Sequence, residues 1–405
     1  MPRASWMHLD LDCFFAAVEI KLNPSLLGKT VLVGRVNPQG KSVPRGVVAT
    51  ASYEARIFGC KSGMPLYQAL KLCPSAIVIG GHYEEYIKAS DQVFQIAARW
   101  APKVERVSID EAFLDFSSTE VIYPDLTKIA QKIRAEVKKE VGITASIGLA
   151  STKVCAKVAS DFNKPDGFCY VPAGSERKFL APLPLRDLPG IGAKTEVYFK
   201  QLGLGTVGDL ARLSHEKIES LGQFPLGLWN AANGRDNIWF VPRVTAKSVS
   251  RSETFYTDRG DENFILAMLR KLAESSGEEM RVEGYSGRCV HVVIRYKDFR
   301  MVGRQRVLPY FTSSTKEIYD LGETLLKELW DRRTPLRLVG IEISQFGESS
   351  QLSLFDAPRE KRLGLEKRID NLRARFGKDA VVPAIMLNLQ PERTGQHLAI
   401  WGKRK

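Results

Sequence analysis

The chain has 405 residues, a formal net charge of +13 and a sequence pI of about 9.4. At roughly 100–200 residues per domain, this length predicts roughly two to four domains. Apolar residues make up 44% and charged residues 26%, which is typical of a folded protein and excludes a disordered one. The excess of basic side chains favours a polyanionic partner, either nucleic acid or an anionic membrane surface.

Two further classes are excluded by what the sequence lacks. No apolar run approaches the roughly 20 residues needed to span a bilayer, and the N-terminus has no long apolar signal-peptide core. The six cysteines are scattered and form no Cys-x-x-Cys pair, which argues against a disulfide framework and a structural zinc site. We therefore expect an intracellular, multidomain protein that binds nucleic acid.

The chain up to Gly167 alternates between strand-like and helical segments. Met7–Asp12 alternates in hydrophobicity as a strand does and runs into a helical pattern at Cys13–Glu19. Val104–Phe116 and Ile143–Leu149 are further strand candidates, and a helical pattern follows the second of them. This alternation predicts an α/β or α+β sheet domain with one inserted lobe.

The rest of the chain divides into a helical region, a second sheet domain and a tail. From Pro182 onward, short helical patterns are separated by glycine-rich turns, notably Leu188–Gly192. A basic segment at 242–248 is poor in helix signals and is typical of a linker. Strand-like runs then return with helical patterns between them, which predicts a smaller α+β domain. These runs are Arg288–Tyr296, Arg300–Leu308 and Arg337–Phe346.

Three carboxylates are the candidate catalytic residues. Asp10 lies at the end of one predicted strand, and Asp110 and Glu111 interrupt another. Because successive strand residues point to opposite faces, the adjacent pair can share one site only where the chain bends, as at a hairpin tip. Clustered carboxylates raise one another's pKa values, and Mg²⁺ relieves that repulsion in two-metal phosphoryl transfer. The alternative for two such segments alone is surface acids at strand ends.

A second group of residues has the chemistry of a triphosphate site. Tyr53 and Arg56 stand three apart, so they share a face if this segment is helical. Arg binds phosphate with two hydrogen bonds, the Tyr hydroxyl supplies another donor, and Lys164 at a helix end adds a point charge. Taken singly, each cation is more commonly a solvated surface residue.

Together these segments resemble the Y-family translesion DNA polymerases, and most closely the bacterial DNA polymerase IV branch. Four ordered motifs at compatible separations carry the resemblance, and such a set is far more specific than any single motif. They are MHLDLDCFFAAVE (Met7–Glu19), ATASYEAR (Ala49–Arg56), SIDEAFLD (Ser108–Asp115) and KVCAKVASDFNKPDG (Lys153–Gly167). The likeness extends through the glycine-rich turn to about residue 348, so it covers most of the chain.

The resemblance implies a role for each matched residue of the catalytic centre. Asp10 and Asp110 match the metal-bridging aspartates, and Glu111 matches the third catalytic carboxylate. The carbonyl of Leu11 matches the main-chain ligand. Two Mg²⁺ per active site are implied, with Mn²⁺ as a substitute. Phe15 matches the steric gate, an aromatic ring in the space that a ribose 2′-hydroxyl would need.

The resemblance also assigns the contacts of the incoming nucleotide. The matched triphosphate contacts are Thr50, Tyr53, Arg56 and Lys164. The backbone amides of Phe14 and Phe15, at a helix start, would add donors. The ordinary alternative for Phe14 is core packing, and for Asp12 we expect support of the strand end rather than catalysis.

Two further features point to DNA. The turn Leu188–Gly192 resembles the hairpin of a helix-hairpin-helix motif, in which Gly190 and Gly192 let backbone N–H groups approach a phosphate. In the second domain three cations fall on one face of a predicted strand, which we expect to be the solvent face, where they would neutralise phosphates. They are Arg300, Arg304 and Arg306. The alternative for the turn is a helix-ending glycine without a ligand, and the alternative for the arginines is solubilising surface charge.

The tail carries a short motif that resembles the bacterial sliding-clamp-binding peptide. Its residues are Gln351, Leu352, Leu354 and Phe355. An amide and apolar side chains in a flexible segment can dock in a preformed groove, although so short a match also arises by chance. Beyond it an amphipathic pattern predicts a helix that ends at Gly377 and whose role, packing or partner binding, is left open. The apolar stripe of this helix is Leu365, Ile369, Leu372 and Phe376.

The sequence therefore predicts an α+β multidomain fold arranged as the right hand of a polymerase. We expect a palm with a mixed sheet and helices, small fingers, a helical thumb with the helix-hairpin-helix turn, and an α+β little finger. The predicted boundaries are palm 1–13 and 82–172, fingers 14–81, thumb 173–240, linker 241–249, little finger 250–348 and tail 349–405.

The expected activity is template-directed, low-fidelity DNA synthesis past damaged bases, in which a primer 3′-hydroxyl attacks the α-phosphate of a dNTP without proofreading. We expect a cytoplasmic, nucleoid-associated monomer that binds primer-template DNA, dNTP and the sliding clamp but no membrane. One rival is a catalytically dead adaptor, against which the intact carboxylates argue. The other is a two-metal nuclease, against which the gate and triphosphate residues argue. The polar loop at Val36–Gly46 leaves lesion preference open.

Overall fold

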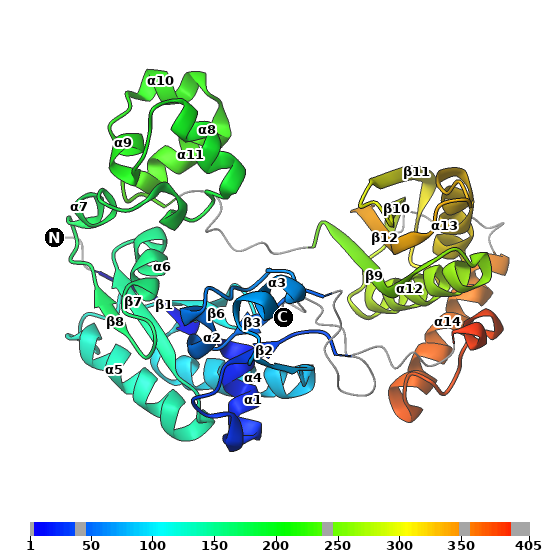
Figure 1. The fold of residues 1–405 in the computed structure, drawn as a ribbon, viewed down its shortest axis with the longest axis horizontal. Helices are drawn as coiled ribbons and strands as arrows, with labels where there is room; N and C mark the ends of the chain where they lie inside the picture. The colour runs from blue at the N-terminus through cyan, green and yellow to red at the C-terminus, as the bar shows by residue number, and fades with distance from the viewer. Residues whose placement is uncertain (1–3, 37–45, 237–245, 348–356, 390–405) are drawn as a thin grey trace. The chain divides into compact units, whose positions relative to one another are not determined.

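The computed structural model of the chain describes residues 4–36, 46–236, 246–347 and 357–389 (Figure 1). These residues fall into two compact units, of which unit 1 lies within residues 1–242 and unit 2 within residues 243–393. Within the described residues, no helix combines the length and the apolar character that crossing a bilayer requires.

A five-stranded sheet forms the centre of unit 1, with the strand order β5-β6-β1-β7-β8. Its strands are β1 (Trp6–Leu11), β5 (Lys103–Arg106), β6 (Glu111–Asp115), β7 (Ala145–Ala150) and β8 (Phe168–Tyr170). Neighbouring strands are antiparallel except for β7 and β8, which are parallel. The stretch predicted as one strand, Val104–Phe116, is therefore a hairpin made of β5 and β6.

The two faces of this sheet differ, as the two-residue period of a strand requires. Met7, Leu9 and Leu11 of β1 point into a buried apolar core. That core is covered by α1 (Phe14–Leu22), α4 (Tyr83–Trp100) and α5 (Leu126–Glu136), which continues into a π-helical turn, η2 (Val137–Val141). The intervening residue His8 instead faces α6 (Lys153–Phe162), where its ring contacts a serine of that helix.

The inserted lobe predicted from the sequence is a small three-stranded sheet with short helices. Its strand order is β3-β2-β4, in which β2 and β4 are parallel. The elements are η1 (Pro24–Leu26), β2 (Val31–Val33), β3 (Thr50–Ala51), α2 (Tyr53–Ile57), α3 (Leu66–Leu72) and β4 (Ile77–Ile79). Leu32, Ala55 and Leu66 are among the side chains that form a separate small core here.

Short helices with glycine-rich turns follow, as the sequence predicts. They are α7 (Glu176–Leu180), η3 (Leu185–Asp187), α8 (Ala193–Gln201), α9 (Val207–Ala211), α10 (His215–Ser220) and α11 (Gln223–Ala232). The turn Leu188–Gly192 joins η3 to α8, and Gly190 within it has a φ of +98°, a conformation that favours glycine. Leu180, Leu210 and Leu228 form a core that also includes side chains of α6.

Unit 2 is built on an antiparallel sheet of four strands in the order β11-β10-β12-β9. Its strands are β9 (Ser248–Arg259), β10 (Gly287–Tyr296), β11 (Met301–Thr312) and β12 (Leu336–Phe346), and its first two helices are α12 (Glu262–Val282) and α13 (Thr315–Leu329). The predicted α+β domain is confirmed, with both helices packed on one buried apolar face. β9 begins at Ser248, within the last two residues of the predicted linker 241–249. The sequence of β9 is largely polar, so it lacks the apolar residues that mark a strand in a sequence.

The C-terminal helix α14 (Ala357–Phe376) ends where the sequence predicts, at Gly377, whose φ of +95° is the left-handed conformation that terminates helices. The apolar stripe predicted for this helix is not its packing face, because Leu365, Leu372 and Phe376 are exposed. Ion pairs between charged side chains hold it against the rest of unit 2 instead. The final turn, η5 (Ala384–Asn388), follows, and Ile385 packs against the core of unit 2.

Candidate active site

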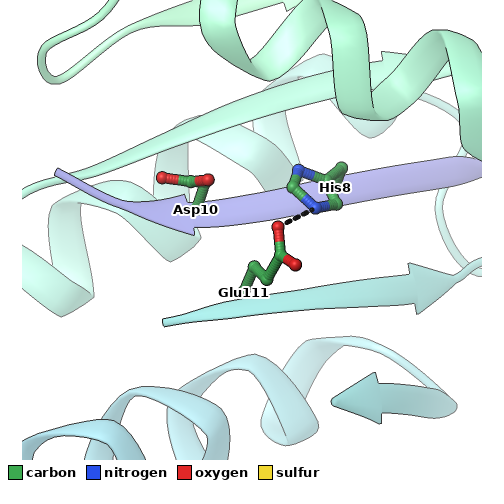
Figure 2. Close-up of side chains that lie close together, drawn as sticks. All are labelled: His8, Asp10 and Glu111. Atoms are coloured by element: carbon green, nitrogen blue, oxygen red, sulfur yellow. Dashed lines mark ion pairs between the residues drawn. The ribbon is translucent and has the colours of Figure 1, made fainter. Parts of the chain in front are cut away.

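The site lies on the α6 side of the five-stranded sheet, at the ends of β1 and β6. Asp10 and Glu111 are directly opposite each other in the antiparallel register of these two strands, so their side chains share a face. His8, two residues before Asp10, lies on that face as well, and Figure 2 shows the three side chains together. One ligand atom from each of the three lies within 4.8 Å of the others, which is the spacing of a candidate metal site.

The hairpin tip explains how adjacent carboxylates serve one site. The Val107 and Ser108 amides both donate to the Glu111 carbonyl, over 2.9 and 3.2 Å, which closes the turn between β5 and β6. Asp110 is the last residue of this turn, and its carbonyl accepts a hydrogen bond from the Leu11 amide over 2.9 Å. The structure therefore brings the predicted carboxylates Asp10, Asp110 and Glu111 to the same end of the sheet.

Two lysines neutralise these carboxylates. Lys164 Nζ lies 2.6 Å from Asp10 Oδ1 and 2.6 Å from Asp161 Oδ1. Lys157 of α6 forms an ion pair with Glu111 Oε2. Lys164 is a predicted triphosphate contact, whereas Lys157 and His8 are not among the residues predicted from the sequence. The signals were available, since His8 shares the strand face of Asp10 and Lys157 is one helical turn beyond Lys153.

The electrostatic state of the site follows from burial and from these contacts. Burial, reinforced by Asp110 and opposed by Lys164, raises the pKa of Asp10 to about 6. Burial also acts to raise the pKa of Glu111, but contacts with His8 and Lys157 outweigh it and hold that pKa well below its usual range. Burial lowers the pKa of His8 to about 4, so its ring is neutral at neutral pH. Asp10 and Glu111 thus each have a lysine beside them.

Asp12 has the supporting position that we expected. Its side chain is buried and accepts hydrogen bonds from Ser146 Oγ over 2.8 Å and from the Asp166 amide over 2.7 Å. The Tyr53 hydroxyl also donates to it, over 3.4 Å. Asp12 therefore connects the strand end to the loop after α6 and to the small lobe.

The two phenylalanines at the start of α1 have different environments. Phe14 is buried in the core of the sheet, so core packing accounts for its side chain. Phe15 is half-buried, and its ring stacks on that of Tyr86 with a centroid distance of 4.5 Å and an interplanar angle of 18°. Tyr86 is fixed in turn by its hydroxyl, which donates to the buried Glu19 over 2.5 Å. The ring of Phe15 is therefore held in one orientation.

The predicted triphosphate contacts of the small lobe lie on β3 and α2. Thr50 is the first residue of β3 and is buried. Arg56 donates from Nε to the Ala51 carbonyl over 3.1 Å, and its guanidinium lies 4.7 Å from the centroid of the Tyr53 ring. Tyr53 and Arg56 thus share a face of α2, as their spacing predicts. The hydrogen bond from Tyr53 to Asp12 brings this face to the end of β1.

The predicted DNA contacts fall in two places. Gly192 precedes α8 as its N-cap residue, and a Cβ on it would meet nothing within 4 Å, so its backbone is open to a ligand. In unit 2, Arg304 and Arg306 pair with Val292 and Val290, which point into the helix-covered core. Partners in register share a face, so these arginines lie on the side of the sheet that carries the helices, although 53% of the Arg304 side chain and 49% of the Arg306 side chain are exposed. Their contact with DNA stays a prediction.

The arginines of β11 instead contact α13. Arg304 and Arg306 both form ion pairs with Glu328, with N–O distances of 2.8 and 2.9 Å. Arg300 precedes β11, and its guanidinium lies 4.2 Å from the centroid of the Tyr296 ring. The predicted clamp residues Gln351, Leu352, Leu354 and Phe355 lie outside the described residues.

Comparisons with known proteins account for this arrangement. The model of the impB/mucB/samB family matches residues 9–161, that of the family's C-terminal domain matches 246–354, and that of the IMS family HHH motif matches 173–204. The DNA polymerase IV of Dehalococcoides mccartyi (strain CBDB1) is 41% identical over 378 residues, which cover 93% of this chain and 95% of the relative. The chain belongs to this family. The predicted membership of the Y family, in the DNA polymerase IV branch, is confirmed.

Further relatives of the family agree. The DNA polymerase IV of Methanoculleus marisnigri is 40% identical over 339 residues, covering 84% of this chain and 93% of that one. A solved Y-family DNA polymerase chimera of Dbh and Dpo4 superposes with a TM-score of 0.73 at 28% identity, over 84% of this chain and 98% of the chimera. The insertion ternary complex of Dbh DNA polymerase gives a TM-score of 0.55 at 28% identity, with the same coverage.

Proposed function

We propose that this chain is a template-directed, low-fidelity DNA polymerase that extends primers past damaged bases, and that Asp10, Asp110 and Glu111 carry its chemistry. The observation that supports this most is the convergence of the three carboxylates at the β5–β6 hairpin tip and the end of β1. The predicted enzyme class, a DNA-directed DNA polymerase, is confirmed by family membership and by relatives named DNA polymerase IV.

The donor set of the site fits hard divalent cations. Asp10 and Glu111 are opposite each other on neighbouring strands, and carboxylate oxygens are the ligands that such cations prefer. We propose Mg²⁺ as the resident ion, held by Asp10, Asp110, Glu111 and the Leu11 carbonyl. The chemistry supplied when two such ions are bound is Lewis-acid polarisation of phosphoryl oxygens.

The side chains of this chain prepare the reaction by position and charge. Lys164 lies beside Asp10, and Arg56 lies on α2 of the small lobe, so a triphosphate that contacts both would be neutralised from both lobes. The backbone amides at the start of α1 add donors for an anion. The ring of Phe15, fixed on Tyr86, would exclude a ribose 2′-hydroxyl by contact.

Partners follow from the same assignment. We propose primer-template DNA and dNTP as substrates, with the turn containing Gly190 and Gly192 binding a DNA phosphate through its backbone. We also propose that the chain works as a monomer in the cytoplasm, close to the nucleoid, and that Gln351, Leu352, Leu354 and Phe355 bind a sliding clamp. Solved relatives include the insertion ternary complex of Dbh DNA polymerase, which supports a site filled by substrates.

The test is primer extension with a labelled primer, Mg²⁺ and saturating dNTP. Asp110→Ala and Glu111→Ala should retain DNA binding and lose extension, because these carboxylates act on charge that develops in the transition state. Asp115→Ala is the matched control, since Asp115 lies at the other end of β6, and it should extend primers at the parental rate. Parental extension by either site variant would refute the assigned site, and shortening of the primer by the parent would indicate a nuclease.

A further inference from the structure

Helix α6 lies unusually close to the sheet beside the catalytic carboxylates. A Cβ on Gly148 of β7 would lie 2.1 Å from the Ala156 carbonyl oxygen and 2.4 Å from the Ser160 amide nitrogen. Only a glycine allows this approach, which places one turn of α6 directly over β1 and β7. Lys157 and Ser160 of that turn consequently reach across β1 to His8 and Glu111.

Polar contacts join the His8 ring to this turn of α6. Ser160 Oγ lies 2.8 Å from His8 Nδ1, a contact in which either atom can be the donor according to the tautomer of the ring. Ser160 Oγ also lies 2.7 Å from the Lys157 carbonyl oxygen, to which it can donate. Ser160 therefore connects one edge of the ring to the backbone of Lys157.

The other ring nitrogen of His8, Nε2, faces Lys157 and Glu111. It lies 3.3 Å from Glu111 Oε2, the contact drawn in Figure 2, and 3.5 Å from Lys157 Nζ, and the His8 side chain is fully buried. Lys157 Nζ also forms the ion pair with Glu111 Oε2, so its ammonium contacts both side chains. The buried ring and the carboxylate together restrict where this ammonium can lie.

The consequence for Glu111 is that one of its oxygens is already occupied by a cation. Lys157 is bound to Oε2, whereas Oε1 has no hydrogen-bond partner within the part of the chain that the structure describes. We propose that Lys157 is a positioning residue that orients Glu111 and competes with divalent cations for its carboxylate, and that His8 and Ser160 hold it for this task. The inference rests on the proposed function, because it takes Glu111 to be a metal ligand.

The same helix offers a matched control. Lys153, one turn before Lys157, forms an ion pair with Glu105 on the neighbouring strand β5, and both side chains are buried. Glu105 is not one of the proposed ligands. Replacing Lys153 therefore removes a buried lysine from the same helix and sheet face without freeing a carboxylate of the metal site.

The experiment is a titration of the full chain, free of DNA, with Mn²⁺, in which the electron paramagnetic resonance signal of the free ion is measured. Lys157→Met should bind Mn²⁺ about tenfold more tightly than the parent, because a contacting positive charge has been removed from the ligand. Lys157→Arg keeps the charge and should bind like the parent, and Lys153→Met should do so as well. If Lys157→Met does not fold, Lys157→Gln serves in the same comparison.

The possible outcomes separate the role of Lys157 from the proposed function of the chain. Parental Mn²⁺ affinity in Lys157→Met, or in Lys157→Gln, would show that the lysine has only a structural role. An equal gain in Lys153→Met would show that the effect is not specific to Glu111. Either result overturns the inference while leaving the proposed function intact, provided that the parent binds Mn²⁺ and extends primers. A parent that neither binds Mn²⁺ nor extends primers overturns both.

Discussion

Arg281 holds the C-terminal helix on unit 2, and its replacement by Met should cost about 3–5 kcal/mol of local stability, as expected when a buried ion pair loses one partner. The Arg281 side chain is only 3% exposed, and that of Asp370 on α14 is 13% exposed. The Arg281 guanidinium donates to Asp370 Oδ2 over 2.6 Å and to Asp370 Oδ1 over 3.0 Å. It also donates to the Ser313 carbonyl over 2.8 Å. Arg281→Met leaves Asp370 as a buried charge without a cation.

The structure also identifies a variant that should recover most of this loss. A buried ion pair replaced by apolar side chains of similar size is often close to neutral in stability, so Arg281→Met combined with Asp370→Leu should restore the helix. Glu366 can stay, because it accepts hydrogen bonds from the Thr315 and Lys316 amides at the start of α13. Lys327→Met, which breaks an exposed ion pair with Glu323 in the same unit, should change stability by no more than about 0.5 kcal/mol.

Hydrogen exchange followed by mass spectrometry measures the effect where it occurs, since the chain has two units and global unfolding need not be two-state. Protection of the α14 amides should fall by about 100-fold or more in Arg281→Met and return in the double variant. Unchanged protection of α14 in Arg281→Met would refute the argument that this buried pair docks the helix.

Three other predictions concern substrate and partner contacts. Phe15→Ala should admit ribonucleotides while changing dNTP use much less, at a stability cost of about 0.5–1.5 kcal/mol for the lost ring pair, and parental rNTP discrimination would show that Phe15 only packs. Glu328→Gln should release the two arginines of β11, so DNA binding should tighten and the slope of log affinity against log salt concentration should steepen by about 1–2. Hydrogen bonds from these arginines lower the pKa of Glu328, so the ion pairs are intact at neutral pH. They are lost only as the pH falls through that lowered pKa. Leu354→Ala with Phe355→Ala should spare basal primer extension and abolish stimulation by a loaded sliding clamp, and a double variant stimulated like the parent would place the clamp contact elsewhere.

Features set by short stretches of sequence were predictable from it. The alternation of Met7–Asp12 places Asp10 on one face of a strand, and the adjacent acids Asp110 and Glu111 require a bend, which the β5–β6 turn supplies. The spacing of Tyr53 and Arg56 and the stop at Gly377 are local in the same sense. Periodicity and turn chemistry act over a few residues, so they can be inferred without knowledge of what packs where.

Features that depend on which surfaces meet were decided by the tertiary structure alone. The face on which Arg304 and Arg306 lie depends on the register of β11 against β10, because a shift of one residue would turn both side chains over. The packing face of α14 depends on Arg281, which lies far away in sequence and offers a buried guanidinium to Asp370 of this helix. The group formed by His8, Lys157 and Glu111 exists because Gly148 lets α6 approach the sheet. Each of these outcomes rests on a contact between residues distant in sequence, whose free energy no local pattern encodes.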